Sequence, residues 1–374
     1  MHEYIVHMNI TPPVFAKTDS IKFFRTLTKR VNDYFKENNL KKTGNWKLHL
    51  KTGIMFLLYL APYFVILTLN LPWWAQLLLT IVMGVGMAGI GMNVMHDANH
   101  GSYSSKNWLN KIMGGSMYLL AGNVNNWQIQ HNVLHHTYTN IHGHDEDLEA
   151  GRIIRFSKSA EWMKINKFQH YYSVFLYGLL TFNWAITTDI KQMRRYIKRG
   201  LSYGEFQSPV KQWTILVVTK IIYISLWIVL PIAIGGISWW KVLLGFSIMH
   251  YVAGLILSIV FQLAHIVEET DNPLPNELGE MDNTWAIHQL YTTANFAPKN
   301  RFVNWFTGGL NHQIEHHIFP NISHVHYQKI SEIVKQTARE HNLPYHEFRT
   351  MRGAIAAHFK HLKELGMKPE PAMN

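Results

Sequence analysis

Histidine is the residue type with the most chemical potential in this sequence, because it occurs 23 times and many copies are clustered. Seven of them fall in three short clusters: His96, His100, His131, His135, His136, His316 and His317. Positions four apart share one face of a helix, so His96 pairs with His100, and His131 pairs with His135. The next residue in the last two clusters is rotated by about 100° and can reach a second ion. Because seven imidazoles offer more nitrogen atoms than one ion can use, the clusters predict a site for two metal ions.

The elements that must position these histidines are long apolar segments. Four segments reach the length of about 20 helical residues that a bilayer requires. They cover residues 53–71, 73–95, 213–236 and 239–264. One residue separates the first segment from the second, and two residues separate the third from the fourth. The sequence therefore predicts an all-α integral membrane protein, with four transmembrane helices arranged as two hairpins and a cytoplasmic helical cap that holds the histidine clusters. The alternative is a soluble protein with four buried core helices.

Positive charge brackets the apolar segments. The net charge is +11, and all but two of the 35 lysines and arginines lie before residue 52, between 96 and 212, or after 265. The exceptions are Lys220 and Lys241. The positive-inside rule then places both termini and the 96–212 segment in the cytoplasm. No nucleic-acid-binding module accompanies the charge, so a nucleic acid is not an expected partner.

The remaining segments have weaker signals. Residues 21–35 read as an amphipathic helix, and the shorter apolar runs 112–121 and 171–184 read as helices at the interface or under the cytoplasmic part. Residues 271–283 read as a loop, because prolines and acids are frequent there. The segment after residue 330 reads as soluble helix.

A glycine pattern in the second apolar segment matches a dinucleotide fingerprint, with glycines at positions 84, 86 and 89. Such a fingerprint should follow a strand and open a helix. Inside an apolar helix, small residues instead allow neighbouring helices to approach closely. Close helix packing is therefore the interpretation that we favour.

The identity of the metal follows from position, because imidazole suits zinc, copper, iron and nickel alike. Cysteine is absent, which excludes thiolate metal sites, disulfides and a thiol nucleophile. The histidine clusters lie beside helices that are able to enclose an acyl chain. Breaking an unactivated C–H bond requires a redox-active metal, which zinc is not. Iron is therefore favoured if the substrate is an acyl chain.

The order of the three clusters around two hairpins resembles the integral-membrane fatty acid desaturases. The clusters read His-x-x-x-His, His-x-x-x-His-His and Gln-x-x-His-His. Glutamine in place of the first histidine of the last cluster is similar to the front-end subgroup, which includes Δ6 and Δ5 desaturases and bacterial linoleoyl-CoA desaturase-like proteins. The similarity covers roughly residues 50–330 and includes the flanking stretches 261–265 and 285–296.

This resemblance implies a di-iron centre, dependence on O₂ and a location in the bacterial inner membrane. It also implies that His265 is a further ligand and that Gln313 binds metal directly or through water. The implied ligand set is His96, His100, His131, His135, His136, His265, Gln313, His316 and His317. The resemblance divides the chain into a cytoplasmic arm (1–48), a desaturase domain (49–330) and a cytoplasmic helical tail (331–374).

Other polar residues are candidates for supporting roles. Ligating imidazoles are normally oriented by carboxylates, and four acids are candidates: Asp97, Asp147, Glu268 and Glu315. His288 is expected to line the substrate passage. His312 lies four positions before His316, but the family commonly has an apolar or aromatic residue there, so we do not expect it to bind metal. His142 and His144 lie in an acidic loop and are expected to be solvated or to support the ligands.

Two other kinds of protein could present clustered histidines. An intramembrane zinc metalloprotease could use the pattern His-Asp-x-x-His at 96–100, but it needs a glutamate base and would leave at least five histidines unexplained. A metal transporter usually binds its ion near the bilayer midplane, whereas these clusters lie outside the apolar segments. Within the desaturase family, a hydroxylase, an acetylenase or a ketolase remains an alternative, because the same oxidant can begin each of these reactions.

Two electrons are required for each double bond. The sequence has no His-Pro-Gly-Gly haem motif and no cysteine for an iron–sulfur cluster. We therefore expect a separate electron donor, a ferredoxin or a cytochrome b5 with its reductase, to dock on the basic cytoplasmic face. The substrate is expected to be a lipid acyl chain, as acyl-CoA or acyl-lipid, and the position of the new double bond depends on channel length.

The charge distribution gives a testable topology. Reporter fusions after Asn38 and after Gly200 are expected to report the cytoplasm, and a reporter inserted at Ile237 is expected to report the opposite side, because positive residues are retained inside. Opposite locations for the first two reporters would contradict the two-hairpin arrangement.

Overall fold

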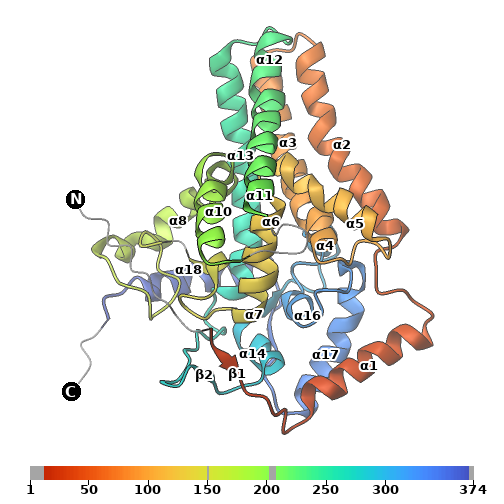
Figure 1. The fold of residues 1–374 in the computed structure, drawn as a ribbon, viewed down its shortest axis with the longest axis vertical. Helices are drawn as coiled ribbons and strands as arrows, with labels where there is room; N and C mark the ends of the chain where they lie inside the picture. The colour runs from red at the N-terminus through yellow and green to blue at the C-terminus, as the bar shows by residue number, and fades with distance from the viewer. Residues whose placement is uncertain (1–11, 150, 202–207, 370–374) are drawn as a thin grey trace.

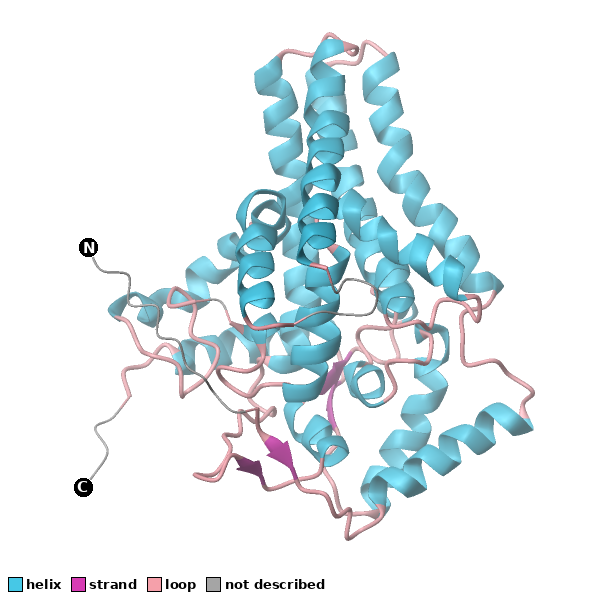
Figure 2. Cartoon of the chain, in the orientation of Figure 1, coloured by secondary structure: helices cyan, strands magenta, loops and turns pink. Residues whose placement is uncertain are grey.

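The computed structural model describes residues 12–149, 151–201 and 208–369. The chain is mostly helical, and its long apolar helices stand together at one end (Figure 1). The shorter helices and the few strands gather at the other end (Figure 2). The three histidine clusters belong to this second part or to its junction with the long helices.

Four helical segments are long and apolar enough to cross a membrane, which confirms the number predicted from the sequence. They are Trp46–Thr68, Trp73–Asn99, Pro209–Ala233 and Trp239–His265. The first is α2 (Trp46–Thr68) and the last is α13 (Trp239–His265); the second joins α3 (Trp73–Ile90), η1 (Gly91–Met95) and α4 (His96–Asn99); the third joins α11 (Pro209–Ile224), η7 (Ser225–Val229) and α12 (Leu230–Ala233).

Two of these helices begin earlier than the apolar pattern predicts. The side chain of Asn45 accepts a hydrogen bond from the amide of Lys47, so α2 starts at 46 instead of 53. The hydroxyl of Ser208 caps α11 in the same way, and Pro209 occupies its first position. Capping satisfies backbone amides that the helix leaves unpaired. The first turns are polar, so a search for apolar runs alone cannot find them.

Glycines let the long helices approach one another. A Cβ atom on Gly84 would lie 2.7 Å from the carbonyl oxygen of Met249 in α13, and one on Gly86 would lie 2.6 Å from the amide nitrogen of Tyr59 in α2. Both distances are too short for a side chain. The glycine pattern of α3 therefore serves packing on both sides, as the sequence interpretation held.

The remaining helices are short, and several are single turns. Their bounds are α1 (Phe23–Glu37), α5 (Asn107–Gly114), η2 (Gly115–Leu120), α6 (Val124–Trp127), η3 (Gln128–His135), α7 (His136–Tyr138), η4 (Glu146–Leu148), η5 (Lys164–Phe168), α8 (Gln169–Tyr177), α9 (Leu180–Asn183), η6 (Trp184–Thr188), α10 (Asp189–Lys198), α14 (Trp285–Thr292), α15 (Arg301–Phe306), α16 (Gln313–Ile318), η8 (His324–His326), α17 (Tyr327–Glu340) and α18 (Met351–Leu365). The expected helices overlap these elements: 21–35 corresponds to α1, 112–121 to α5 and η2, 171–184 to α8, α9 and the start of η6, and the segment after 330 to α17 and α18.

The expectation of an all-α chain needs a small correction. The described residues contain two parallel two-stranded ladders, one between β1 (Val14–Phe15) and β2 (Glu280–Met281), and one between β3 (Ala294–Phe296) and β4 (His346–Phe348). The first ladder ties the N-terminal arm to the segment predicted as a loop. Strands of two or three residues leave too little periodicity for a sequence pattern to detect.

The N-terminal helix α1 packs against the part of the molecule that holds the shorter helices. Its buried residues recur every four positions and are Phe23, Leu27, Val31 and Phe35. They share one apolar cluster with Leu290 of α14, Ile314 of α16 and Ile330 of α17. The arm and the C-terminal part therefore enclose the helix that carries the third histidine cluster, and the boundary expected at residue 330 falls inside α17.

The last helix, α18, packs against α8 and the end of α13. Leu362 and Leu365 join an apolar cluster with Tyr177 and Ile266. Beside them, His358 donates from Nδ1 to the carbonyl oxygen of Ile266 at 2.7 Å, and its Nε2 accepts from the Tyr177 hydroxyl at 2.9 Å. A neutral imidazole with its proton on Nδ1 makes both hydrogen bonds.

The His358 contacts predict a loss of stability in acid. Burial lowers the pKa of His358 from 6.5 to about 4. Its stabilising effect is thus complete above pH 6.5 and is lost as the pH falls toward 4, by roughly 3 kcal/mol from a shift of this size. His358→Gln, which does not titrate, should show a smaller fall in melting temperature between about pH 7.5 and 4.5 than the wild type. His142→Gln, at an exposed position, should keep the wild-type dependence. Equal pH dependence in all three proteins would contradict this assignment.

Candidate metal centre

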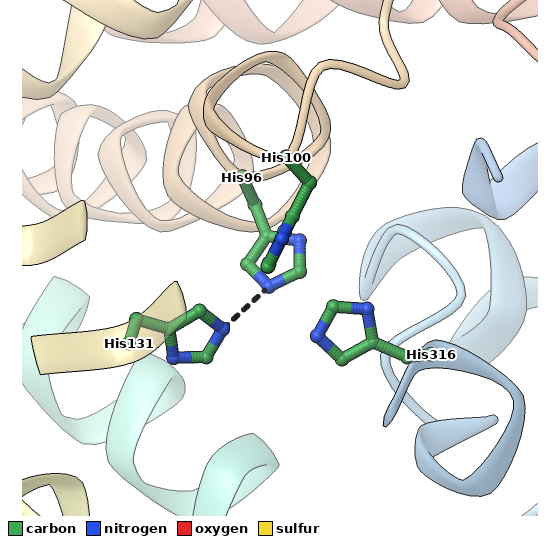
Figure 3. Close-up of side chains that lie close together, drawn as sticks. All are labelled: His96, His100, His131 and His316. Atoms are coloured by element: carbon green, nitrogen blue, oxygen red, sulfur yellow. Dashed lines mark hydrogen bonds between the residues drawn. The ribbon is translucent and has the colours of Figure 1, made fainter. Parts of the chain in front are cut away.

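The three histidine clusters meet where the long helices adjoin the shorter ones. His96 opens α4 and His100 follows it, while the second cluster lies on η3 and α7, and the third lies on α16. Three separate segments supply four histidines that point toward one another, namely His96, His100, His131 and His316 (Figure 3). One ring nitrogen from each histidine lies within 4.8 Å of those from the others. The dashed line in Figure 3 joins Nε2 of His96 to Nε2 of His131, which are 3.2 Å apart.

A second group of ligand nitrogens lies next to the first. It consists of His135, His265 and His317, whose ring nitrogens are also within 4.8 Å of one another. His136 lies between the groups, because its Nε2 is 3.0 Å from Nε2 of His316 and its ring stacks on that of His317 with centroids 4.4 Å apart. The arrangement offers two adjacent sets of imidazoles, which fits two ions better than one.

The second cluster is held on a π-helix. Residues Gln128–His135 form η3, in which each turn closes on the fifth residue, and such turns are frequent at functional sites. His131 and His136 are five positions apart, and their Nε2 atoms lie 3.3 Å from each other. Regular α-helical spacing instead pairs His131 with His135 and turns His136 away. The π-helix therefore changes which histidines share a face.

Hydrogen bonds at Nδ1 fix the orientation of the imidazoles. Nδ1 of His131 lies 2.7 Å from a carboxylate oxygen of Asp147. The corresponding distances for the other anchored histidines are 2.9 Å from His135 to Asp145, 3.1 Å from His316 to the Tyr327 hydroxyl, 2.9 Å from His317 to Oε1 of Gln289, and 3.4 Å from His265 to the carbonyl oxygen of Thr292. A proton held at Nδ1 leaves the lone pair of Nε2 free to bind a metal.

Several Nε2 atoms are buried without a hydrogen-bond partner among the described residues. They belong to His100, His135, His265 and His317. A buried polar atom that lacks a partner costs about 1–3 kcal/mol. Four such atoms at the meeting point of anchored imidazoles fit a centre in which metal ions are the missing partners.

The electrostatics keep these imidazoles neutral. Burial, followed by the neighbouring histidines, holds the pKa of His100, His135 and His136 well below the ordinary value of 6.5. The same causes lower the pKa of His316 and His317. Neutral imidazole is the form that binds metal, so the site is ready for ions at neutral pH.

Of the four acids expected to orient ligands, only Asp147 contacts one. Asp97 instead accepts a hydrogen bond from Ser323 at 2.7 Å and lies 3.0 Å from Nδ1 of His324. Glu315 accepts from Asn295 and Tyr345, and so fixes α16 instead of an imidazole. Glu268 is exposed and pairs with Lys360, outside the centre.

Three anchoring residues were missed, namely Asp145, Gln289 and Tyr327. Asp145 lies in the acidic loop beside Asp147. The sequence shows that this loop is acidic, but it does not show that Asp145 contacts His135. Gln289 lies in α14 and Tyr327 lies in α17. Neither belongs to the cluster whose histidine it anchors. Only their three-dimensional placement reveals the role.

The other histidines have structural contacts. His288 donates to the carbonyl oxygen of Thr139 at 2.8 Å and is not among the residues that line the cavity beside the centre, so its place in the substrate passage stays a prediction. His312 is buried outside both groups, with Nδ1 3.7 Å from Glu315. His142 is exposed as expected, whereas His144 is buried against the ring of Tyr138.

An apolar cavity of about 140 Å³ adjoins the first group of histidines. Its walls include Met95, Trp127, Trp184, Leu257 and Phe261. His96, His131 and Gln313 also line it. A largely apolar space lined by imidazoles of the centre can hold a hydrocarbon chain beside bound metal.

Apolar membrane-length helices and a buried histidine centre define a class of membrane metalloprotein. Comparison with known proteins narrows the class, since residues 71–349 match the pattern of the family described as fatty acid desaturase. The chain is 35% identical to the sn-1 linoleoyl-lipid 6-desaturase of Arthrospira platensis, covering 94% of both chains. It is 35% identical to the sn-1 linoleoyl-lipid 6-desaturase of Synechocystis sp., over 92% of this chain and 95% of that one, and 32% identical to the acyl-lipid (8-3)-desaturase of Physcomitrium patens, over 94% and 73%. The chain belongs to the fatty acid desaturase family and is an oxidoreductase.

The anchoring of His317 predicts an effect on metal content. Gln289→Leu removes the nearer acceptor for the Nδ1 proton and leaves only the Thr139 hydroxyl at 3.2 Å, so it should lower the affinity for metal by about 10- to 100-fold, as loss of such partners commonly does. Gln289→Glu keeps an acceptor and should retain metal. Metal per chain, measured on purified protein after dialysis against a weak chelator, tests both. Full metal content in Gln289→Leu, or equal loss in exposed Gln328→Leu, would contradict the role of this contact.

Proposed function

We propose that this chain introduces a double bond into the acyl chain of a membrane lipid, at the carboxyl side of existing double bonds. The observation that carries the proposal is the largely apolar cavity that His96, His131 and Gln313 also line. The names of the two cyanobacterial relatives support a linoleoyl chain carried by a lipid and reaction at carbon 6. They favour acyl-lipid over acyl-CoA, a choice that the sequence left open.

We propose that the centre holds two iron ions. His96, His100, His131 and His316 would bind one ion, and His135, His265 and His317 would bind the other. His136 faces both sets, and Gln313 reaches the first ion directly or through water. The chemistry that such a pair supplies when bound is the reduction of O₂ to two waters, coupled to removal of two hydrogens from adjacent CH₂ groups, with two electrons and two protons from outside. Imidazole alone does not select iron, so the family and the apolar cavity carry this choice.

The residues of the chain then act by positioning. Asp145, Asp147 and Gln289 hold protons at Nδ1, which keeps each Nε2 directed at the centre. The walls formed by Trp127 and Phe261 exclude water and hold the selected CH₂ pair against the metals. These fixed contacts leave few degrees of freedom to the bound acyl chain.

The proposed arrangement in the membrane follows the charge pattern. The four apolar helices cross the inner membrane as two hairpins, and both termini and the centre face the cytoplasm. Electrons reach the centre from a separate ferredoxin or cytochrome b5 with its reductase, attracted by the basic cytoplasmic surface. Steering of this kind weakens as salt is added.

The function is tested in a bacterial host that lacks polyunsaturated lipids and is fed linoleate. Lipids from cells that express the chain should contain a product with a new double bond at carbon 6, identified by gas chromatography–mass spectrometry. His136→Ala and His317→Ala should abolish the product, because each removes a nitrogen from the centre, while His142→Ala should retain it. In membranes supplied with NADPH, product should require an added reductase and ferredoxin.

Metal analysis of the purified active chain should give two irons. Stoichiometric zinc in active protein, or full activity of His136→Ala, would contradict the di-iron assignment. A hydroxylated or acetylenic product would keep the centre and change the reaction class.

A further inference from the structure

A lysine lies inside one of the apolar helices and contacts neither the histidines nor the cavity. Lys220 occupies the middle of the span Pro209–Ala233, and its side chain is only 18% exposed. A charged side chain at such a depth is costly unless it is paired, and it then commonly serves function. The desaturase reaction as proposed gives Lys220 no role.

The ammonium group of Lys220 is surrounded by three oxygen atoms from two other parts of the chain, the turn at Ala121 and the continuous helical run that contains Trp184 and Asp189. Its Nζ lies 2.7 Å from Oδ2 of Asp189 at the start of α10. It also donates to the carbonyl oxygens of Ala121 and Trp184, each at 2.5 Å. An ammonium has three protons to donate, so these contacts saturate it. Asp189 is itself 3% exposed, which makes the pair a buried one.

The segments that Lys220 joins lead to the cavity and to the second histidine cluster. Trp184 and Leu120, the residue before Ala121, line the cavity. Ala121 has a left-handed backbone with φ of 66°, a conformation that a non-glycine residue keeps only when its surroundings hold it. Asn126 donates to the backbone carbonyl of Asp189 at 2.8 Å and directly precedes Trp127 of the cavity wall.

The wall in turn contacts the centre. The ring of Trp127 stacks on that of His131, with centroids 4.5 Å apart and planes 26° apart. A shift of Trp184 and Leu120 relative to Trp127 would therefore change both the space for the acyl chain and its register against the histidines. Because a displacement of about 1 Å can cost roughly 100-fold in rate, small movements of this wall matter.

We propose that Lys220 is a positioning residue that fixes the cavity wall, and that its contacts with Asp189, Ala121 and Trp184 determine which carbons of the acyl chain face the centre. This inference rests on the proposed desaturase function. Lys220 acts through the backbone of the wall and through the ion pair, without touching the substrate or the metals.

The test is the position of the double bond in lipids of the linoleate-fed host. Lys220→Met should lower formation of the normal product by about 10- to 100-fold and raise the share of products with the double bond at neighbouring carbons. Lys220→Arg keeps the charge and several donors, and should restore the normal position. Lys241→Met is the matched control, because Lys241 is the other lysine in the apolar regions, is exposed, and lies over the ring of Trp240 at one end of its helix. It should give the wild-type pattern.

A second variant keeps the test informative if the unpaired carboxylate harms insertion. Lys220→Met with Asp189→Asn removes both charges, so it should accumulate in the membrane and still misplace the double bond. Wild-type rate and product position in either variant would overturn the inference while the wild type remains active. A wild-type chain that forms no product would overturn the proposed function and this inference with it.

Discussion

The structure depends on one constraint, which is that a ligating imidazole must keep Nε2 free of a proton, and a hydrogen-bond acceptor at Nδ1 secures this for five of the eight histidines of the centre. Asp145, Asp147 and Gln289 meet this requirement with distances of 2.7 to 2.9 Å. Burial alone would favour neutral rings but would leave them free to flip. With Nδ1 anchored, Nε2 atoms from several segments converge, and some lie only 3.0 to 3.3 Å from one another. The shorter helices are arranged so that these acceptors lie beside the histidines.

Several polar groups inside the apolar helices are paired with polar groups of other segments. His250 of α13 is fully buried, with Nε2 2.8 Å from the Tyr223 hydroxyl and Nδ1 3.0 Å from Oγ1 of Thr181. Lys220 is saturated by a carboxylate and two carbonyl oxygens. In a hydrocarbon environment an unpaired group of this kind would cost several kcal/mol, so each pairing also fixes the helices that supply it. The paired polar groups in this region therefore fix the positions of the helices relative to one another.

The sequence predicted the number of long helices and the meeting of the histidine clusters, because both rest on strong local signals. Apolar runs define helices such as α3 and α13, and histidines four apart define a shared face. The start of α2 at Trp46 was missed because capping by Asn45 extends the helix through polar residues. The π-helix η3 was missed because its spacing is set by packing and leaves no simple pattern. The partners of the ligands were predicted only where they are close in sequence, as for Asp147, and the exposed Glu268 shows that proximity to a ligand in sequence is a weak guide.

The cavity and the centre are shaped by the same short segments, and this has a consequence for specificity. Trp127 lines the cavity, stacks on His131 and belongs to the helix that continues into η3. With the acyl chain held in this cavity, as proposed, any change that moves this helix shifts the ligating histidines and the acyl chain together, so their relative position is partly conserved. Trp184, in contrast, lines the cavity from a segment without ligands. Movement on that side changes the register of the chain against a fixed centre. Divergent positions of reaction within one family are therefore easier to reach through the wall that carries Trp184 than through the wall that carries Trp127.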